Sequence, residues 1–316
     1  MEIFEVIQPG PLTTVQDMGR YGYQQYGVPV SGAMDNYALR LANLLVGNSE
    51  GDACLEITLL GLQLRVLEDT VVAITGADLS PKLNGESLPM WEAVMVGRGD
   101  TLSFPWPKVG CRSYLAVAGG IDVPKVMGSR STHTRSRIGG FEGRALCAGD
   151  RLSSGQAYPQ ILKRRLPSQY IPEYRNQSEL RVIMGPQDDH FTEEGIRTFL
   201  GSEYTISTKA DRMGYRLEGP PIEHKAGADI ISDGIPLGAV QVPGDRLPIV
   251  VLADRQTTGG YTKIATVITV DINKLAQAKP GDKVKFTQIR EEEAYQSLKE
   301  YEHTIYTLKR WVQQGG

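Results

Sequence analysis

Glycine and proline interrupt this chain at short intervals, and no other feature restricts its fold as much. The 316 residues include 35 glycines and 18 prolines, spread along the whole length. Both residue types break regular elements, so such frequent interruption favours many short strands joined by turns over long helices. We therefore predict a mainly β protein. A chain of this length is also long for a single hydrophobic core, which favours two domains.

Two segments depart from the β pattern. Apolar residues recur at spacings of three and four from Ala38 to Leu45, which predicts a short helix that Asp35 caps and Gly47 ends. Residues 291–316 are charged, with apolar side chains along one side, and predict a C-terminal helix.

The domain boundaries follow from a weakly periodic, proline-containing segment at 153–177, which we interpret as a linker. We place one domain at residues 1–165, a second at 178–290 and the helix at 291–316. A faint internal repeat supports two related halves. Gly27–Met34 resembles Gly234–Val240, and the Gly-Asp pair before residues 101–104 resembles the pair before residues 283–286.

Two polar loops carry most of the residues that suggest chemistry. The apolar segment Leu247–Ala253 predicts a buried strand, and it ends in D-R-Q-T-T-G-G-Y at Asp254–Tyr261. Near the start of the chain, Thr13–Tyr23 again combines two threonines with glutamine, aspartate, arginine, glycine and tyrosine. We predict that these two loops face one another across a cleft. The alternative is that each is only a polar turn.

The chemistry available to these loops is that of carboxylates, amides and guanidinium groups. Asp17 and Asp254 are candidates for a general acid or base. Arg20 and Arg212 are candidates for binding a carboxylate or a phosphate, although arginines more often form surface ion pairs. The remaining candidates for substrate binding are Gln16, Tyr23, Gln256, Thr257, Thr258 and Tyr261.

Several classes of function find no support in the sequence. The formal charge of −3 gives no electrostatic case for binding nucleic acid or an anionic membrane surface. The chain has no G-x-x-x-x-G-K-[ST] phosphate-binding loop and no G-x-S-x-G nucleophile motif. The four histidines are far apart in sequence, so we predict no metal site. No Met-Lys-Met lysine is present, so we expect no biotin on this chain.

The cysteine pattern and the start of the chain bear on its location. The three cysteines contain no C-x-x-C pair, and no apolar signal sequence follows Met1. No apolar segment approaches the ~18 residues that a membrane-spanning helix needs. We therefore expect a cytoplasmic protein.

The ordered motifs of the chain resemble those of a known family. P-G-P-L-T-T-V-Q-D-M-G-R-Y-G-Y-Q at Pro9–Gln24 and the S-G-A-M-D segment from Ser31 are similar to the opening of the allophanate hydrolase subunit 2 family. The likeness continues through I-G-G-F-E-G-R at Ile138, D-R-M-G-Y-R-L-E-G at Asp211 and the Gln256–Tyr261 loop. That family includes the sporulation regulator KipA and the C subunit of 5-oxoprolinase, and its members are often described as biotin-dependent carboxyltransferase-like.

The resemblance implies a fold and an activity. It implies two cyclophilin-like β-barrel domains and an obligate partner, the KipI-like B subunit. Together with an A subunit, such a pair opens 5-oxo-L-proline to L-glutamate at the expense of ATP, which the partner binds or shares. We therefore expect a hydrolase subunit that is inactive without its partners. The alternatives are a KipA-type protein that antagonises a KipI-like histidine-kinase inhibitor and a urea carboxylase-like carboxyltransferase component.

Site roles follow from the implied reaction as a hypothesis. A lactam is a poor electrophile, so phosphorylating its oxygen supplies a leaving group before water attacks. Arg20 and Arg212 would bind the anionic groups, Asp17 or Asp254 would activate water, and the amide, hydroxyl and phenol side chains would hold the ring. The same loops are also candidates for the interface with the partner proteins.

Overall fold

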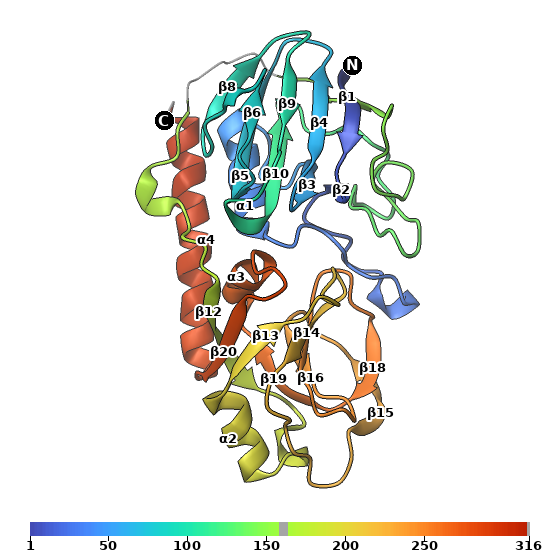
Figure 1. Ribbon diagram of the computed structural model, residues 1–316, viewed down its shortest axis with the longest axis vertical. Helices are drawn as coiled ribbons and strands as arrows, with labels where there is room; N and C mark the ends of the chain where they lie inside the picture. Colours follow the sequence, from blue (N-terminus) through green and yellow to red (C-terminus); the bar gives the residue numbers. More distant parts are fainter. Residues whose placement is uncertain (158–163, 315–316) are drawn as a thin grey trace. The chain divides into compact units, whose positions relative to one another are not determined.

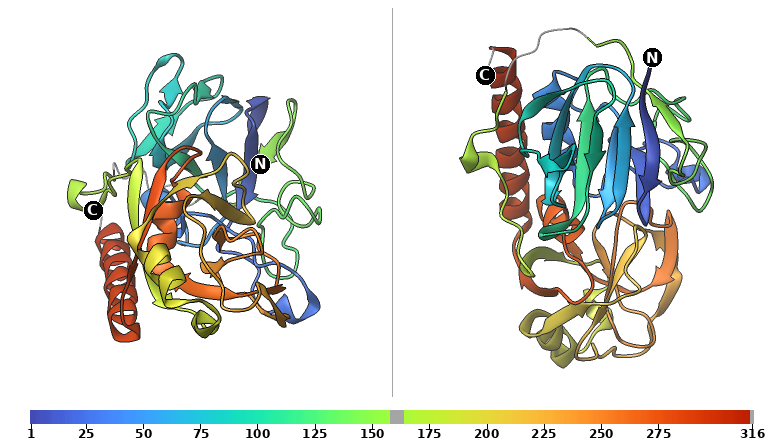
Figure 2. Two further views of the ribbon diagram at one scale, coloured as in Figure 1. Left: turned by 60° about the horizontal axis from the view of Figure 1, so that its bottom comes forward. Right: turned by 45° about the horizontal axis from the view of Figure 1, so that its top comes forward.

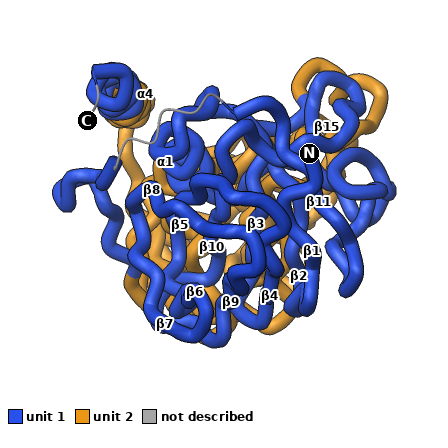
Figure 3. Tube along the Cα trace, turned by 90° about the horizontal axis from the view of Figure 1, so that it is seen from above, with its two compact units in different colours: residues 1–20, 31–174, 303–316 blue, residues 21–30, 175–302 orange. Residues whose placement is uncertain are grey.

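The strands and helices of the chain fall into two units, which Figure 3 shows in different colours. The computed structural model describes residues 1–157 and 164–314. The first unit contains residues 1–20, 31–174 and 303–316, and the second contains residues 21–30 and 175–302. Part of the predicted linker (158–163) and the last two residues of the predicted C-terminal helix lie outside the described residues.

Two antiparallel sheets and one helix form the first unit, with helix α1 at Asn36–Val46 (Figure 1). The sheet orders are β11-β1-β4-β9-β6-β7 and β2-β3-β10-β5-β8. The strands are β1 (Glu2–Pro9), β2 (Leu12–Gln16), β3 (Cys54–Thr58), β4 (Leu62–Val66), β5 (Thr70–Asp78), β6 (Lys82–Leu83), β7 (Glu86–Ser87), β8 (Ala93–Val96), β9 (Thr101–Ser103), β10 (Val109–Val117) and β11 (Arg151–Ser153).

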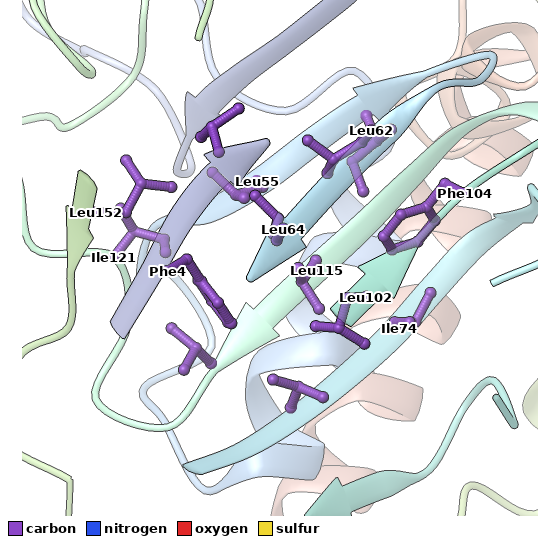
Figure 4. Close-up of a cluster of buried hydrophobic side chains, with 14 of the residues drawn as sticks. Phe4, Leu55, Leu62, Leu64, Ile74, Leu102, Phe104, Leu115, Ile121 and Leu152 are labelled. Carbon is purple, nitrogen blue, oxygen red and sulfur yellow. The ribbon is translucent and has the colours of Figure 1, made fainter. Parts of the chain in front are cut away.

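The core of the first unit lies between its sheets. Alternate residues of each strand point inward, so apolar side chains from strands of both sheets meet (Figure 4). Phe4, Leu64 and Leu102 come from the first sheet, whereas Leu55 and Leu115 come from the second, and all five are fully buried. These side chains hold the two sheets together and so fix the ends of the strands, from which the polar loops extend.

Helix α1 confirms the prediction made from its apolar spacing. Asp35 Oδ1 accepts a hydrogen bond from the Ala38 amide at 3.0 Å, and Gly47 ends the helix with a left-handed φ of 84°. The predicted C-terminal helix is also present as α4 (Glu291–Gln313).

A closed seven-stranded barrel and a separate two-stranded ribbon form the second unit (Figures 1 and 2). The barrel order is β12-β19-β16-β17-β14-β13-β20, and β12 closes it by pairing in parallel with β20. The ribbon pairs β15 with β18. The elements are β12 (Gln177–Met184), α2 (Glu193–Gly201), β13 (Glu203–Ile206), β14 (Gly214–Glu218), β15 (Asp229–Gly234), β16 (Ala239–Gln241), β17 (Ile249–Val251), β18 (Thr258–Tyr261), β19 (Lys263–Val267), α3 (Ile272–Ala276) and β20 (Lys283–Gln288).

Together the two units confirm the prediction of a mainly β protein with few helices. The predicted strand before Asp254 is present as β17. Both repeated Gly-Asp pairs form turns that lead into strands, at residues 99–100 before β9 and at residues 281–282 before β20. Each aspartate accepts a hydrogen bond from the amide three residues before it, at 2.7 and 3.0 Å. Among the described residues, no helix is both long and apolar enough to cross a bilayer.

One buried ion pair of the second unit makes stability depend on pH. Asp271 is fully buried and accepts hydrogen bonds from Arg181 at its amide (2.9 Å), Nε (3.0 Å) and Nη2 (2.8 Å), and Lys274 lies 2.9 Å away. Burial alone would raise the pKa of Asp271, but the Arg181 and Lys274 contacts outweigh it and the pKa is lowered.

The expected result follows from the sign of that shift. Below the unfolded pKa of ~3.9 the unfolded chain takes up a proton that folded Asp271 resists, so stability is lost as pH falls from about 5 towards 2. Asp271→Asn should lower the free energy of unfolding at pH 7 by about 1–3 kcal/mol. It should also flatten the acid limb of stability against pH, measured by urea unfolding. An unchanged acid limb would contradict this role.

Candidate functional site

Asp17, at the end of β2, is the centre of a hydrogen-bonded cluster in the first unit. Its Oδ1 accepts bonds from the Ser129 and Ser131 hydroxyls at 2.7 and 2.5 Å and from the Gly19 amide at 2.8 Å. Its Oδ2 accepts a bond from the Arg130 amide at 2.5 Å. The side chain is buried, so donors of the chain itself occupy both oxygens. In this geometry the carboxylate fixes the loop at residues 129–131.

Two other predicted site residues belong to the same cluster. Arg20 is completely buried, and its Nε and Nη2 donate to the carbonyls of Val126 and Ser131 at 2.9 and 2.8 Å. Gln16 is also completely buried, and its Nε2 donates to the Thr132 carbonyl at 3.1 Å. The structure therefore brings Gln16, Asp17 and Arg20 together around one loop, where they hold backbone.

Glycines of the I-G-G motif are required for this packing. Gly139 has a φ of 67°, and a Cβ there would collide with the Ser131 carbonyl and the Arg20 guanidinium. Gly140 has a φ of 56°, and a Cβ there would collide with the Thr132 side chain. Only glycine combines this backbone conformation with so close an approach.

The S-G-A-M-D segment packs against the same cluster. Ala33 donates its amide hydrogen to the Asp17 carbonyl at 2.9 Å, and a Cβ on Gly32 would lie 2.9 Å from the Gly19 nitrogen. Ser31 adopts a left-handed φ of 57° to enter this turn. Three segments distant in sequence thus form one rigid polar cluster in the first unit.

A buried acid and a buried phenol support this segment. Glu56 Oε2 accepts bonds from the Tyr114 hydroxyl (2.7 Å) and the Met34 amide (2.9 Å), and Tyr114 accepts a bond from the Asp35 amide (2.8 Å). Burial, followed by the charges of Glu56 and Asp35, raises the pKa of Tyr114, so it stays a neutral donor. Our sequence analysis missed this pair, although a glutamate inside the apolar strand C-L-E-I-T was a signal for it.

A surface pocket of about 480 Å³ adjoins the glycine loop of the first unit. Its walls come from three segments, 122–126, 137–143 and 151–153. They combine apolar side chains with guanidinium and carboxylate groups. The lining residues are Asp122, Val123, Pro124, Val126, Arg137, Gly139, Gly140, Phe141, Glu142, Gly143, Arg151 and Ser153.

In the second unit, Arg212 and Asp254 form a buried two-bond ion pair. Arg212 Nε and Nη2 donate to Asp254 Oδ2 and Oδ1 at 3.0 and 3.1 Å, and both side chains are 6% exposed. The Asp254 amide also donates to the Arg212 carbonyl at 2.9 Å. The predicted anion ligand and the predicted acid–base group therefore neutralise one another in this geometry.

The other predicted residues of the second unit are more accessible. Gln256, Thr258 and Tyr261 are exposed, whereas Thr257 and Tyr23 are half-buried. Thr258 and Tyr261 lie on β18, at either end of its glycine pair. Gln16, Asp17 and Arg20 belong to the first unit and these residues to the second. That the two polar loops face one another across a cleft stays a prediction.

A buried lysine and a buried glutamine of the second unit escaped the sequence analysis. Lys263 and Gln241 are paired across β19 and β16, and both are buried. The signal was a lysine between Thr262 and the apolar residues that follow it. Among the described residues, no group of three or more histidines, cysteines or carboxylates is placed to hold a metal ion.

Comparison with known proteins identifies the family. The model of the carboxyltransferase domain, subdomains A and B, matches residues 26–288. The chain is 39% identical over 306 residues to the C subunit of 5-oxoprolinase from Escherichia coli (strain K12), covering 97% of each chain. It is 34% identical over 310 residues to the C subunit of 5-oxoprolinase from Haemophilus influenzae, covering 98% of this chain and 99% of that one.

A solved structure extends the relationship. The chain superposes on the K. lactis urea amidolyase with a TM-score of 0.91 and 34% identity, covering 98% of this chain. It spans only 20% of that protein. The family match, the full-length relatives and the shared fold agree, and the chain therefore belongs to the carboxyltransferase-domain family, with subdomains A and B.

Proposed function

We propose that the chain is the C-type subunit of a 5-oxoprolinase, which opens 5-oxo-L-proline to L-glutamate. The observation that carries this proposal is the match to the C subunit of the E. coli 5-oxoprolinase over 97% of both chains at 39% identity. Because a fold alone hosts many functions, agreement over the full length at this identity matters more than the shared architecture.

The enzyme we propose needs further subunits and ATP. The relatives carry the name of one lettered subunit of 5-oxoprolinase, which supports an enzyme of several subunits. We propose two partners, a KipI-like subunit of the B type and a subunit of the A type, with ATP bound by the partner or shared with it. Phosphoryl transfer to the lactam oxygen releases ADP. Water then attacks the carbonyl carbon, the C–N bond breaks with a proton going to nitrogen, and phosphate leaves.

We further propose that the two buried carboxylates act by positioning. Asp17 holds the loop at residues 129–131, and Asp254 holds Arg212. Their lone pairs are already occupied by donors of the chain, which supports this role over direct activation of water. The exposed side chains Gln256, Thr258 and Tyr261 are the better candidates for contact with the substrate ring.

The direct test is reconstitution. The chain is mixed with its A-type and B-type partners, and glutamate release from 5-oxoproline is measured with and without ATP. We expect release only when this chain and ATP are both present, with ADP formed in step with glutamate. The chain alone, and the two partners without it, are the matched controls and should release none.

The remaining outcomes separate the alternatives. Glutamate release at the same rate without this chain would refute the proposed role. Tight binding to a KipI-like partner without any turnover would instead favour a regulatory protein of the KipA type.

A second candidate function rests on the urea amidolyase relatives. The carboxyltransferase model and the 35% identity to the Lachancea kluyveri urea amidolyase, over 97% of this chain but 18% of that protein, favour it. In this reaction the carboxyl group leaves the ureido nitrogen of carboxybiotin for a substrate amide nitrogen, and the substrate proton returns to biotin. Transfer of labelled carboxyl from a biotinylated carrier protein to urea, in the presence of this chain, would support it over lactam opening.

A further inference from the structure

A buried cation of the second unit has an exposed partner. The Lys263 side chain is 2% exposed, and its Nζ lies 3.3 Å from Asp233 Oδ2 on a side chain that is 60% exposed. Lysine is almost never fully buried unless it is paired, because removing its charge from water costs several kcal/mol. A solvated carboxylate at 3.3 Å offsets only part of that cost. The lysine is therefore placed where a better anionic partner would be bound strongly.

An amide donor lies beside this lysine. Gln241 stands directly opposite Lys263 in the antiparallel pairing of β16 with β19, so the two side chains share one face of the barrel wall. Gln241 Nε2 is buried and makes no hydrogen bond within the part of the chain that the structure describes. An unsatisfied buried donor costs about 1–3 kcal/mol, so a ligand oxygen that accepts its hydrogen would be favoured.

The ribbon brings two more groups to the same place. Gly259 of β18 lies close to Gln241, because a Cβ built on it would be 3.1 Å from Gln241 Nε2. Gly259 is also the pairing partner of Asp233 on β15. Four strands therefore meet at one point, which holds two hydrogen-bond donors, one exposed carboxylate and a glycine without a side chain.

Asp233 shows which ligand chemistry this point accepts. Its carboxylate accepts a bond from the Gly234 amide at 2.7 Å and from Lys263, and these two contacts hold its pKa below the usual range. It is thus an anion already bound to Lys263, but a loosely held and solvated one. A substrate carboxylate can replace it without a change in the charge of the site.

The two arginines predicted to bind anions are engaged elsewhere. Arg212 forms the two-bond pair with Asp254, and Arg20 donates to two backbone carbonyls. A carboxylate at either would compete with short, well-aligned contacts. At Lys263 it would compete with a single contact of 3.3 Å.

We propose that Lys263 and Gln241 bind the carboxylate of the substrate, which takes the place of the Asp233 side chain. The inference rests on the proposed function, because 5-oxoproline is the carboxylate in question. Lys263 supplies the charge and one hydrogen bond, and Gln241 Nε2 supplies a second hydrogen bond to the other oxygen. The lactam ring then lies towards the Thr258–Tyr261 strand.

The test uses the reconstituted enzyme with full-length variants of this chain. Lys263→Met removes the charge and nearly keeps the volume, and we expect KM for 5-oxoproline to rise roughly 10- to 100-fold with a smaller change in kcat. Lys263→Arg should recover part of that loss. Gln241→Glu replaces the amide donor with an anion beside Lys263 and should also raise KM by roughly tenfold or more.

Asp233→Asn gives the effect of opposite sign. It weakens the competing contact, so KM should fall several-fold, an outcome that a merely structural ion pair would not produce. Lys283→Met is the matched control, because Lys283 is a half-exposed lysine on β20 of the same barrel that pairs with Glu203. It should leave KM unchanged.

The outcomes are separable. Co-elution of each variant with its partners and its melting temperature report folding and assembly independently of KM. Absence of 5-oxoproline turnover by the unaltered enzyme would overturn the proposed function and this inference together. Normal turnover with KM unchanged in Lys263→Met and Gln241→Glu would overturn the inference alone.

Discussion

Replacing Arg212 with methionine is expected to lower the free energy of unfolding by about 3–5 kcal/mol. The substitution leaves the Asp254 carboxylate buried without the two hydrogen bonds, at 3.0 and 3.1 Å, that neutralise it. An isolated charge in such surroundings costs far more than the intact pair contributes. Urea unfolding followed by circular dichroism measures the effect.

A double variant supplies the control for this prediction. Arg212→Met combined with Asp254→Leu removes both charges and keeps the volume, and much of the lost stability should return, because apolar replacements of buried ion pairs are often neutral. Equal instability in the single and double variants would contradict the argument. It would then follow that the shape of the pair, and not its charge balance, stabilises the fold.

The second large effect is expected at Asp17. Asp17→Ala leaves four donors of the first unit, two amides and two hydroxyls, without their acceptor. Each unsatisfied buried donor costs about 1–3 kcal/mol, less whatever water recovers, so we expect a loss of about 3 kcal/mol or more in stability. The loop at residues 129–131 should lose its fixed position, and turnover by the reconstituted enzyme should fall more than a hundredfold, as expected for misplaced groups.

Graded substitutions test whether positioning is the cause. Ser129→Ala removes one of the four donors and should cost about 1 kcal/mol. Asp17→Asn keeps the shape but turns an acceptor into a donor, and it should reduce turnover while the chain still co-elutes with its partners. Full activity of Asp17→Asn would remove Asp17 from the site.

Local features of this fold could be predicted because local physics determines them. The spacing of apolar residues after Asp35 defined α1, and the Gly-Asp pairs defined turns, since a left-handed glycine and a short carboxylate act within four residues. The mainly β architecture followed from the frequency of breakers. None of these features needs knowledge of a distant segment.

The environment of each site residue could not be predicted in this way. Asp17 is held by donors more than a hundred positions away in sequence, and Arg212 by a carboxylate 42 positions away. Lys263 is hidden by strand pairing, because a shift of one residue would turn it from the interior to solvent. Residues 21–30 and 303–316 join the unit opposite to the one their sequence position suggests. Composition and periodicity carry no record of such pairings.

The parallel pairing of β12 with β20 bears on how the second unit is made in the cell. These are the first and last strands of the barrel in sequence, and each is the neighbour that completes the ring. Until the ribosome has released β20, the nascent chain carries two open strand edges that invite pairing with other chains. Contacts this distant in sequence also form slowly. Synthesis of this unit therefore includes an interval of exposure to aggregation, which ends only when its final strand emerges.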